Sequence, residues 1–188
     1  MTAYEAETVS SRNIFQGNFI SVAVDRVRFD DGREADREVV RHPGAVGVLV
    51  MDEEGSILMV RQGRHAVSNH LLEIPAGKLE ANEDPWECAK RELEEETGYR
   101  CGGLELLTAY YSSPGFCDEK VHVFLGADLE KVSEAPEADG DEPISIEWLS
   151  EEEAVSAVFD GRIVDAKTII AITLFKLRKH PEDLKVEI

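Results

Sequence analysis

The most informative stretch of the chain is "GKLEANEDPWECAKRELEEETGY", Gly77–Tyr99. It carries the signals of a helix with two defined ends. Asp84 is a residue type favoured just before a helix, and Pro85 suits the first helical position. Gly98 suits the position just after the last turn. The stretch therefore predicts a helix of about thirteen residues between Asp84 and Gly98, roughly 20 Å long.

This predicted helix is strongly acidic. Eight of the 23 residues in the stretch are Asp or Glu, and Glu94, Glu95 and Glu96 are consecutive. Like charges on one helix repel each other, so their concentration needs an explanation. A solvated acidic face is the usual meaning of a run of glutamates. The alternative is a group of carboxylates gathered to bind a cation.

The helical projection places several of these carboxylates together. At about 100° per residue, Glu92 and Glu96 lie one turn apart, and Glu95 lies further round the same side. Carboxylates held at the edge of a core are unfavourable unless a cation joins them. Several oxygen ligands suit Mg²⁺ or Mn²⁺. The buried stripe expected beside them consists of Trp86, Ala89, Leu93 and Thr97.

The spacing of the fixed residues favours the cation site. The pattern is Gly77, five residues, Glu83, seven residues, Arg91-Glu92-Leu93, one residue, Glu95-Glu96, one residue and Gly98-Tyr99. It resembles the Nudix box, the signature of the Nudix hydrolase superfamily. The one departure is the final tyrosine, where a smaller aliphatic residue is commoner. Many fixed positions at fixed spacing make this signal far more specific than a lone short motif.

The resemblance implies a metal cofactor, Mg²⁺ or Mn²⁺, and its ligands. Glu92 and Glu96 are expected to be the principal ligands, with Glu95 in the same cluster. The backbone carbonyl of Ala76 often joins them. A diphosphate repels both hydroxide and carboxylates, so divalent ions are needed to neutralise it before water attacks.

Other residues are expected to position and activate the reactants. By resemblance, Arg91 and Glu83 orient the ligating carboxylates, and Arg91 thereby serves catalysis. Gly77 is expected to allow a tight turn that brings backbone close to the metal. The general base in the similar subgroup commonly lies on an acidic loop, which here is "EADGDEPISIEW" and indicates Glu142. Glu95 remains the alternative base, because a sequence does not fix the reach of a side chain.

The order of elements indicates an α+β fold. Phe19–Phe29 alternates and is rich in β-branched residues, and "ADREVVRH" follows it after a turn, so the two form an N-terminal antiparallel hairpin. Gly44–Asp52 is a continuous apolar run typical of a buried strand. The segments "SEEEAVSAVFDG" and "DAKTIIAITLFKLRK" predict two helices near the C-terminus. The resemblance implies an α/β/α Nudix sandwich, a mixed β-sheet between helices.

Two regions follow from this organisation. Residues 1–42 are expected to form an N-terminal β region, and residues 43–188 the Nudix catalytic domain. The segments "EVVRHPGAVGVLV", "MVRQGR", "LLEIPAGKLE" and "YYSSPGFCDE" are similar to ADP-ribose pyrophosphatases and related nucleoside-diphosphate-sugar hydrolases. Those enzymes are typically homodimers that exchange N-terminal strands. A lone hairpin is marginally stable, which agrees with a partner surface.

The same resemblance implies a set of substrate contacts. Phe19 is a candidate for stacking on the base and Arg37 for reaching across the dimer, although a strand Phe is usually core and an edge Arg usually solvated. Arg64 is a candidate for a phosphate or ribose contact, and Gly77 for close approach of the backbone. A proline near the turn "SPGF" is a feature of ADP-ribose-type enzymes, although a Pro-Gly turn is also ordinary in other proteins. Its residues are Pro114, Gly115 and Phe116.

Composition excludes several classes of function. The net charge of −19 opposes binding to nucleic acid or anionic lipid. No run of about 18 apolar residues exists, so no membrane span is expected. The N-terminus lacks a basic region followed by an apolar stretch, so no secretory signal is expected. Three cysteines in no zinc-ligand spacing indicate reduced thiols in a cytoplasmic protein.

The favoured function is hydrolysis of ADP-ribose to AMP and ribose 5-phosphate. A GDP-sugar, a UDP-sugar or a dinucleotide is the alternative substrate, because base recognition rests on few contacts. A non-catalytic module that binds nucleotide-sugars is a second class, and the complete set of box glutamates argues against it. Nucleic-acid processing is disfavoured by the acidic charge. The expected partners are a small nucleotide-sugar and a second copy of the chain.

Overall fold

The computed structural model describes residues 6–132 and 144–181 of the chain. Its contacts divide the chain into two compact units. The first unit consists of residues 1–44 and 110–120, and the second of residues 45–109 and 121–188.

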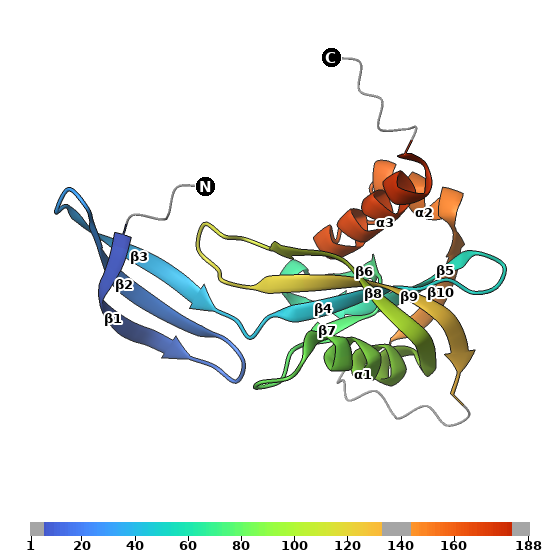
Figure 1. Cartoon of the computed structure of the whole chain (residues 1–188), viewed down its shortest axis with the longest axis horizontal. Helices are drawn as coiled ribbons and strands as arrows, with labels where there is room; N and C mark the ends of the chain where they lie inside the picture. The colour runs from blue at the N-terminus through green and yellow to red at the C-terminus, as the bar shows by residue number, and fades with distance from the viewer. Residues whose placement is uncertain (1–5, 133–143, 182–188) are drawn as a thin grey trace, which may run out of the picture. The chain divides into compact units, whose positions relative to one another are not determined.

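The first unit is built on a three-stranded antiparallel sheet in the order β1-β2-β3 (Figure 1). Its strands are β1 (Ala6–Gln16), β2 (Ser21–Phe29) and β3 (Glu34–Arg41). The predicted hairpin of β2 and β3 is confirmed, with Gly32 in the left-handed region at φ 82° in its turn. Strand β1 was not predicted, because its residues are almost all exposed and show no apolar alternation.

A buried carboxylate joins the parts of this unit. Asp25 in β2 is only 4% exposed. It accepts hydrogen bonds from the Ser11 hydroxyl at 2.6 Å and from Arg41 Nη2 at 2.5 Å. Arg41 Nη1 also donates to Asp118 at 3.2 Å, which ties the segment 110–120 to β3. Because the charge of Asp25 is paired, its burial is tolerated.

The second unit contains two sheets, of which the four-stranded one is mixed, as predicted, and the three-stranded one is antiparallel. The strand orders are β10-β5-β6 and β7-β4-β9-β8. Strand β4 pairs with β9 in parallel and with β7 antiparallel, which makes the four-stranded sheet mixed. The strands are β4 (Ala45–Leu49), β5 (Ser56–Arg64), β6 (Asn69–Glu73), β7 (Ala76–Lys78), β8 (Tyr99–Tyr111), β9 (Lys120–Lys131) and β10 (Ser145–Ser150).

Helices cover both sides of these strands. Figure 1 shows α1 on one side and α2 and α3 on the other, so the α+β sandwich is confirmed. A short 3₁₀ helix, His65–Val67, follows β5. None of the described helices is long and apolar enough to cross a membrane. The helices are α1 (Pro85–Thr97), α2 (Glu151–Phe159) and α3 (Ala166–Lys179).

The ends of α1 lie where the sequence predicts them. Asp84 Oδ1 accepts a hydrogen bond from the Trp86 N–H at 2.8 Å. Gly98 takes the left-handed conformation, φ 70°, and its N–H donates to the Glu94 carbonyl at 2.8 Å. Both contacts satisfy backbone groups that a helix end leaves unpaired. The helix that carries the acidic run is therefore fixed at both ends by local sequence.

Helix α1 packs on the sheet through small and aliphatic side chains. Cys88, Ala89 and Leu93 are fully buried against a cluster that includes Phe124 of β9. The prediction that Trp86 lies in the buried stripe is wrong, since it is 40% exposed. Trp86 is the second residue of the helix, and its ring meets the Phe124 ring edge-on with centroids 4.9 Å apart. Cys88 therefore lies on the buried face of α1, where the helical projection had placed Trp86.

Candidate active site

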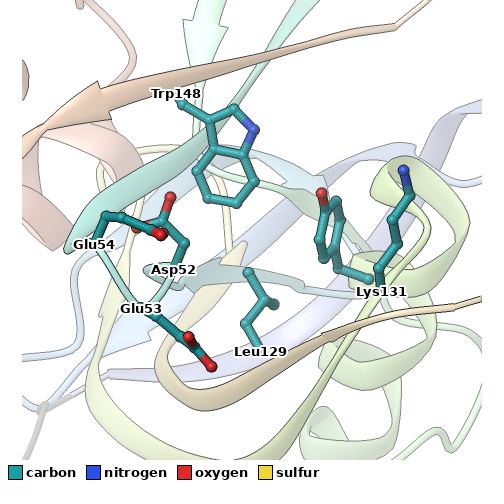
Figure 2. Close-up of a pocket in the computed structure, with 7 residues that line it drawn as sticks. Asp52, Glu53, Glu54, Leu129, Lys131 and Trp148 are labelled. Carbon is teal, nitrogen blue, oxygen red and sulfur yellow. The ribbon is translucent and has the colours of Figure 1, made fainter.

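Two places in the second unit are candidates for a functional site. One is a cavity of about 430 Å³ beside Tyr99, Leu129 and Trp148, with the acidic turn Asp52–Glu54 at its rim (Figure 2). The Tyr99 and Trp148 rings meet edge-on with centroids 5.7 Å apart, so Tyr99 packs against Trp148. None of the residues of this cavity belongs to the glutamate cluster of α1. The second place is that cluster.

Strand β7 lies directly under the glutamates of α1. Gly77 is in this strand, paired with Val46 of β4. A Cβ atom added to Gly77 would lie 1.9 Å from Cδ of Glu92 and 2.1 Å from its Oε1. The prediction that Gly77 makes a tight turn is wrong, because it is part of a strand. Glycine is needed here because the Glu92 carboxylate occupies the space of a side chain.

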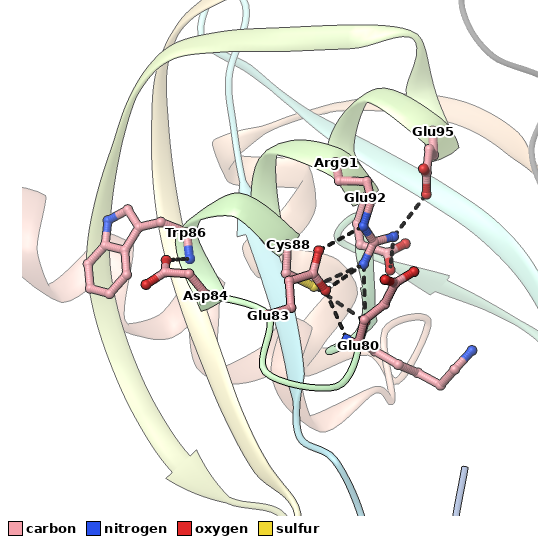
Figure 3. A network of polar contacts seen from close by, with 9 residues as sticks. Glu80, Glu83, Asp84, Trp86, Cys88, Arg91, Glu92 and Glu95 are labelled. Atoms are coloured by element: carbon pink, nitrogen blue, oxygen red, sulfur yellow. Dashed lines mark hydrogen bonds and ion pairs between the residues drawn. The ribbon is translucent and has the colours of Figure 1, made fainter. Parts of the chain in front are cut away.

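Arg91 is the centre of the polar network on α1 (Figure 3). Its Nε and Nη2 donate to the two carboxylate oxygens of Glu83, each at 2.9 Å. Its Nη1 donates to Glu92 Oε1 at 2.8 Å and to Glu95 Oε2 at 3.0 Å. Its Nη2 also reaches the Lys78 carbonyl at 3.3 Å. One guanidinium therefore orients three carboxylates and holds the helix to the end of β7.

Glu83 is the partner that fixes Arg91 in place. The Glu83 side chain also accepts a hydrogen bond from the Glu80 N–H at 2.9 Å, which closes the loop before α1. The bidentate contact with Arg91 lowers the pKa of Glu83 to about 2. Glu83 is consequently ionised at neutral pH, and the geometry agrees with its expected orienting role.

Glu96 is held separately, at the other end of the cluster. Its Oε2 accepts a hydrogen bond from the Ala76 N–H at 2.9 Å. Burial raises the pKa of Glu96 to about 7, and the nearby charge of Glu92 adds to the shift. Burial also raises the pKa of Glu92. At both carboxylates the effect of burial on the pKa outweighs the contacts with Arg91 and the Ala76 N–H, so an ionised pair here is only partly compensated.

The donor set fits a divalent cation. Arg91 supplies one positive charge to Glu83, Glu92 and Glu95. Within the described part of the chain, the hydrogen bond to Glu96 comes from a backbone N–H. As they stand in residues 6–132 and 144–181, no three acidic, His or Cys side chains are arranged to hold a metal ion. The available ligands are hard carboxylate oxygens, the type that Mg²⁺ and Mn²⁺ prefer.

A second charged group lies close to this cluster. Arg64, at the end of β5, donates from Nε and Nη2 to the two oxygens of Glu73 at 2.8 and 2.7 Å. Glu73 is 1% exposed and also pairs with Lys167 of α3. The charges of Arg64 and Lys167 both act on Glu96 and lower its pKa, which places this group within electrostatic reach of the cluster.

Comparison with models of protein families shows to which family the chain belongs. The model of the NUDIX domain matches residues 41–171, and the model of the nucleoside diphosphate sugar hydrolase N-terminal domain matches residues 7–40. The chain belongs to the Nudix hydrolase family. Nudix hydrolases generally require a divalent metal ion, in agreement with the donor set on α1.

Individual relatives of this Nudix hydrolase cover nearly the whole chain. It is 44% identical over 179 residues to the ADP-ribose pyrophosphatase of Bacillus subtilis (strain 168), which covers 95% of this chain and 97% of that protein. It is 42% identical over 176 residues to the methanol dehydrogenase activator of Bacillus methanolicus, covering 94% and 95%. A crystal structure of an ADP compounds hydrolase superposes with a TM-score of 0.81 at 18% identity, covering 99% of this chain and all of that one, and shows the fold.

Several predicted substrate contacts of this Nudix hydrolase lie in the first unit. Phe19 is 52% exposed and precedes β2, with its ring edge-on to His42 at 5.7 Å. Arg37 lies on β3 with its guanidinium 5.6 Å from the Phe29 ring. The turn of Pro114, Gly115 and Phe116 is closed by a hydrogen bond from the Phe116 N–H to the Ser113 carbonyl at 3.1 Å. The predicted base Glu142 lies outside the described residues.

Sequence reasoning missed the residues that surround Arg64. Glu73, Lys167 and Thr168 come together from segments 94 residues apart. Thr168 Oγ1 accepts a hydrogen bond from the buried Ile74 N–H at 3.0 Å. The one local signal was Asp165, whose side chain caps α3 by accepting from the Thr168 N–H at 3.0 Å.

Proposed function

We propose that this Nudix hydrolase splits the diphosphate of ADP-ribose into AMP and ribose 5-phosphate with Mg²⁺ or Mn²⁺. The observation that carries the proposal is the group of α1 carboxylates held by a single guanidinium over a side-chain-free strand position. The substrate class is supported by the match of residues 7–40 and by the Bacillus subtilis relative.

The residues have distinct roles in this proposal. Glu92, Glu95 and Glu96, with the Ala76 carbonyl, would hold the divalent ion, which when bound would supply positive charge to the diphosphate and acidify a bound water. Arg91 keeps two of these carboxylates in position. Arg64 contacts the anionic substrate and the backbone at Gly77 approaches it closely.

The overall reaction requires one water and no other reactant. The water oxygen bonds to one phosphorus, the bridging P–O bond breaks, and each half leaves as a phosphate monoester. The proton of the water passes to a carboxylate, for which Glu142 is the first candidate and Glu95 the second.

The proposal extends to assembly. Residues 1–42 exchange with a second copy of the chain, and residues 43–188 carry the chemistry. Within the first unit, exposed apolar side chains support a partner surface. Phe19 and Arg37 then contact the substrate bound to the partner, together with the turn at Pro114, Gly115 and Phe116. The exposed apolar side chains of the first unit that support this surface are Val9, Ile14, Phe15 and Phe19, each 43–54% exposed.

The enzyme is also proposed to act in the cytoplasm.

The test is a panel of substrates with purified protein and Mg²⁺. ADP-ribose, GDP-mannose, UDP-glucose and NAD⁺ are incubated separately, and released AMP, GMP or UMP is measured by chromatography. The expected result is AMP from ADP-ribose, with Glu96→Gln inactive. Glu94→Gln is the matched control, because Glu94 belongs to the same acidic run but pairs with Arg100 on the exposed side. Release from none of the substrates overturns the proposal and supports a binding module.

Assembly is tested by light scattering of the same preparation. A mass of two chains is expected, and the mass is expected to fall to one chain in a variant that lacks residues 1–42. A fully active monomer contradicts the exchanged-strand arrangement.

A further inference from the structure

Among the described residues of the second unit, the Glu73 carboxylate is the most deeply buried charge that the proposed chemistry does not use. Both of its oxygens are engaged: Oε1 accepts from Arg64 Nε, and Oε2 accepts from Arg64 Nη2 and Lys167 Nζ. With the side chain 1% exposed, an isolated carboxylate here would be strongly unfavourable. Burial alone would raise the pKa of Glu73, but the two cations bring it below its ordinary value. Glu73 is therefore ionised and shared between two positive side chains.

Lys167 is an unexpected residue for its place in the helix. It lies in the first turn of α3, where the helix dipole disfavours a cation. Its side chain is only 13% exposed, although lysine is costly to bury. Asp165 Oδ1 lies 3.1 Å from its ammonium and supplies a second counter-charge. A residue that breaks two local preferences is commonly retained for a site rather than for stability.

The stem of Lys167 passes close to the strands that hold the glutamates. A Cβ atom added to Gly47 of β4 would lie 3.7 Å from Lys167 Cδ. Gly47 is paired in register with Ala76 of β7, whose N–H holds Glu96. Lys167 therefore reaches Glu73 across the same pair of strands that supports the metal-binding cluster.

Arg64 is the exposed member of the group. Its side chain is 38% exposed, while its Nε and Nη2 are fixed in one plane by Glu73. Among the described residues, Nη1 of Arg64 forms no hydrogen bond, so this edge is available to an anion. A bidentate carboxylate fixes the orientation of a guanidinium, but it also cancels its charge. Because Lys167 shares Oε2 of Glu73, less of the negative charge of Glu73 acts on Arg64.

We propose that Lys167 is a positioning residue, which shares the Glu73 carboxylate with Arg64 so that Arg64 is held in orientation without its positive charge being fully neutralised toward the diphosphate of the substrate. The inference rests on the proposed function, since Arg64 is there the contact for the anion. It predicts that loss of the Lys167 charge weakens substrate binding more than it slows the chemical step.

The test compares the kinetics of matched lysine variants with ADP-ribose and Mg²⁺. Lys167→Met is expected to raise KM about tenfold and to change kcat by less than about threefold. Lys167→Arg is expected to restore most of the affinity, which a purely structural loss would not predict. Lys176→Met is the control, because Lys176 is on the same helix but pairs with Glu151, at 3.0 Å, and not with Glu73. A KM for Lys167→Met no different from that of Lys176→Met overturns the inference.

A second measurement separates this inference from the proposed function. Binding of inorganic pyrophosphate with Mg²⁺ is measured by calorimetry for wild type, Lys167→Met and Lys167→Gln. Both variants are expected to bind about tenfold more weakly. If wild type hydrolyses no substrate, the proposed function fails and pyrophosphate binding alone decides about Lys167. If Lys167→Met does not fold, Lys167→Gln decides, and unchanged pyrophosphate affinity in it overturns the inference.

Discussion

The substitution Gly77→Ala tests whether the Glu92 carboxylate must lie over strand β7. The new Cβ atom would lie 1.9 Å from Glu92 Cδ, whereas real Cβ contacts stay beyond 3.0 Å. The carboxylate must therefore move by about 1.1 Å or more, away from the strand. The colliding atoms are the far end of a flexible side chain, so the backbone can stay in place. We expect a folded protein in which the Glu92 carboxylate, the proposed metal ligand, is displaced.

The expected loss of activity follows from this displacement. Misplacing a catalytic group by about 1 Å costs on the order of 100-fold in rate. That factor corresponds to about 2.7 kcal/mol of transition-state stabilisation. The assay is kcat/KM for ADP-ribose over a range of Mn²⁺ concentrations, with the melting temperature measured in parallel. We expect kcat/KM to fall about 100-fold, the Mn²⁺ requirement to rise, and the melting temperature to stay within a few degrees of wild type.

Gly103→Ala is the matched control for this experiment. Gly103 lies in β8, and a Cβ atom added there meets no atom within 4 Å. Its activity and Mn²⁺ requirement are expected to equal those of wild type. If Gly77→Ala is as active as Gly103→Ala, the reasoning about Glu92 is refuted. An activity loss that only follows unfolding refutes it as well.

The remaining predictions concern the contacts around the site and one distant ion pair. Arg91→Gln leaves Glu83 without its cation, and we expect the free energy of unfolding, measured by denaturant titration, to fall by about 2 kcal/mol. A stability equal to wild type would contradict the role of Arg91 as the centre of the polar network. Thr168→Val removes the acceptor of the buried Ile74 N–H and is expected to lower the free energy of unfolding by about 1–3 kcal/mol. Thr168→Ser keeps the hydroxyl and should retain most of the wild-type stability. Ion pairs, first with Lys179, lower the pKa of Glu151, so its ionised form stabilises the fold above about pH 4.5 and loses this effect as the pH falls. The stability difference between wild type and Glu151→Gln should therefore be about 1 kcal/mol at pH 7 and shrink below pH 4; a difference independent of pH would refute it.

Local sequence signals explain why much of the fold was predictable. Asp84 and Gly98 each act through backbone atoms a few residues away, so the ends of α1 could be placed from sequence. Ser150 and Glu153 form the predicted capping box of α2. Strand β1 was missed because both of its faces are largely exposed, so no apolar alternation marks it. Trp86 was misplaced because a helix end leaves part of a large ring in solvent.

The candidate site was predictable only in part, for a related reason. The positions of Glu83, Arg91 and Glu92 follow from motif spacing on one loop and helix. The reason for Gly77 required three dimensions, because the atoms that occupy its side-chain space belong to Glu92, fifteen residues later. Glu73 and Lys167 are 94 residues apart, and no local pattern connects them.

The most direct measurement is Mn²⁺ binding followed by electron paramagnetic resonance, because it detects the cation that the crowded glutamates of α1 are expected to share. Wild type and Glu94→Gln are expected to bind Mn²⁺ equally, and Glu96→Gln is expected to lose most of this binding while keeping its fold. Equal Mn²⁺ binding by folded Glu96→Gln and wild type would show that these carboxylates gather for some other reason.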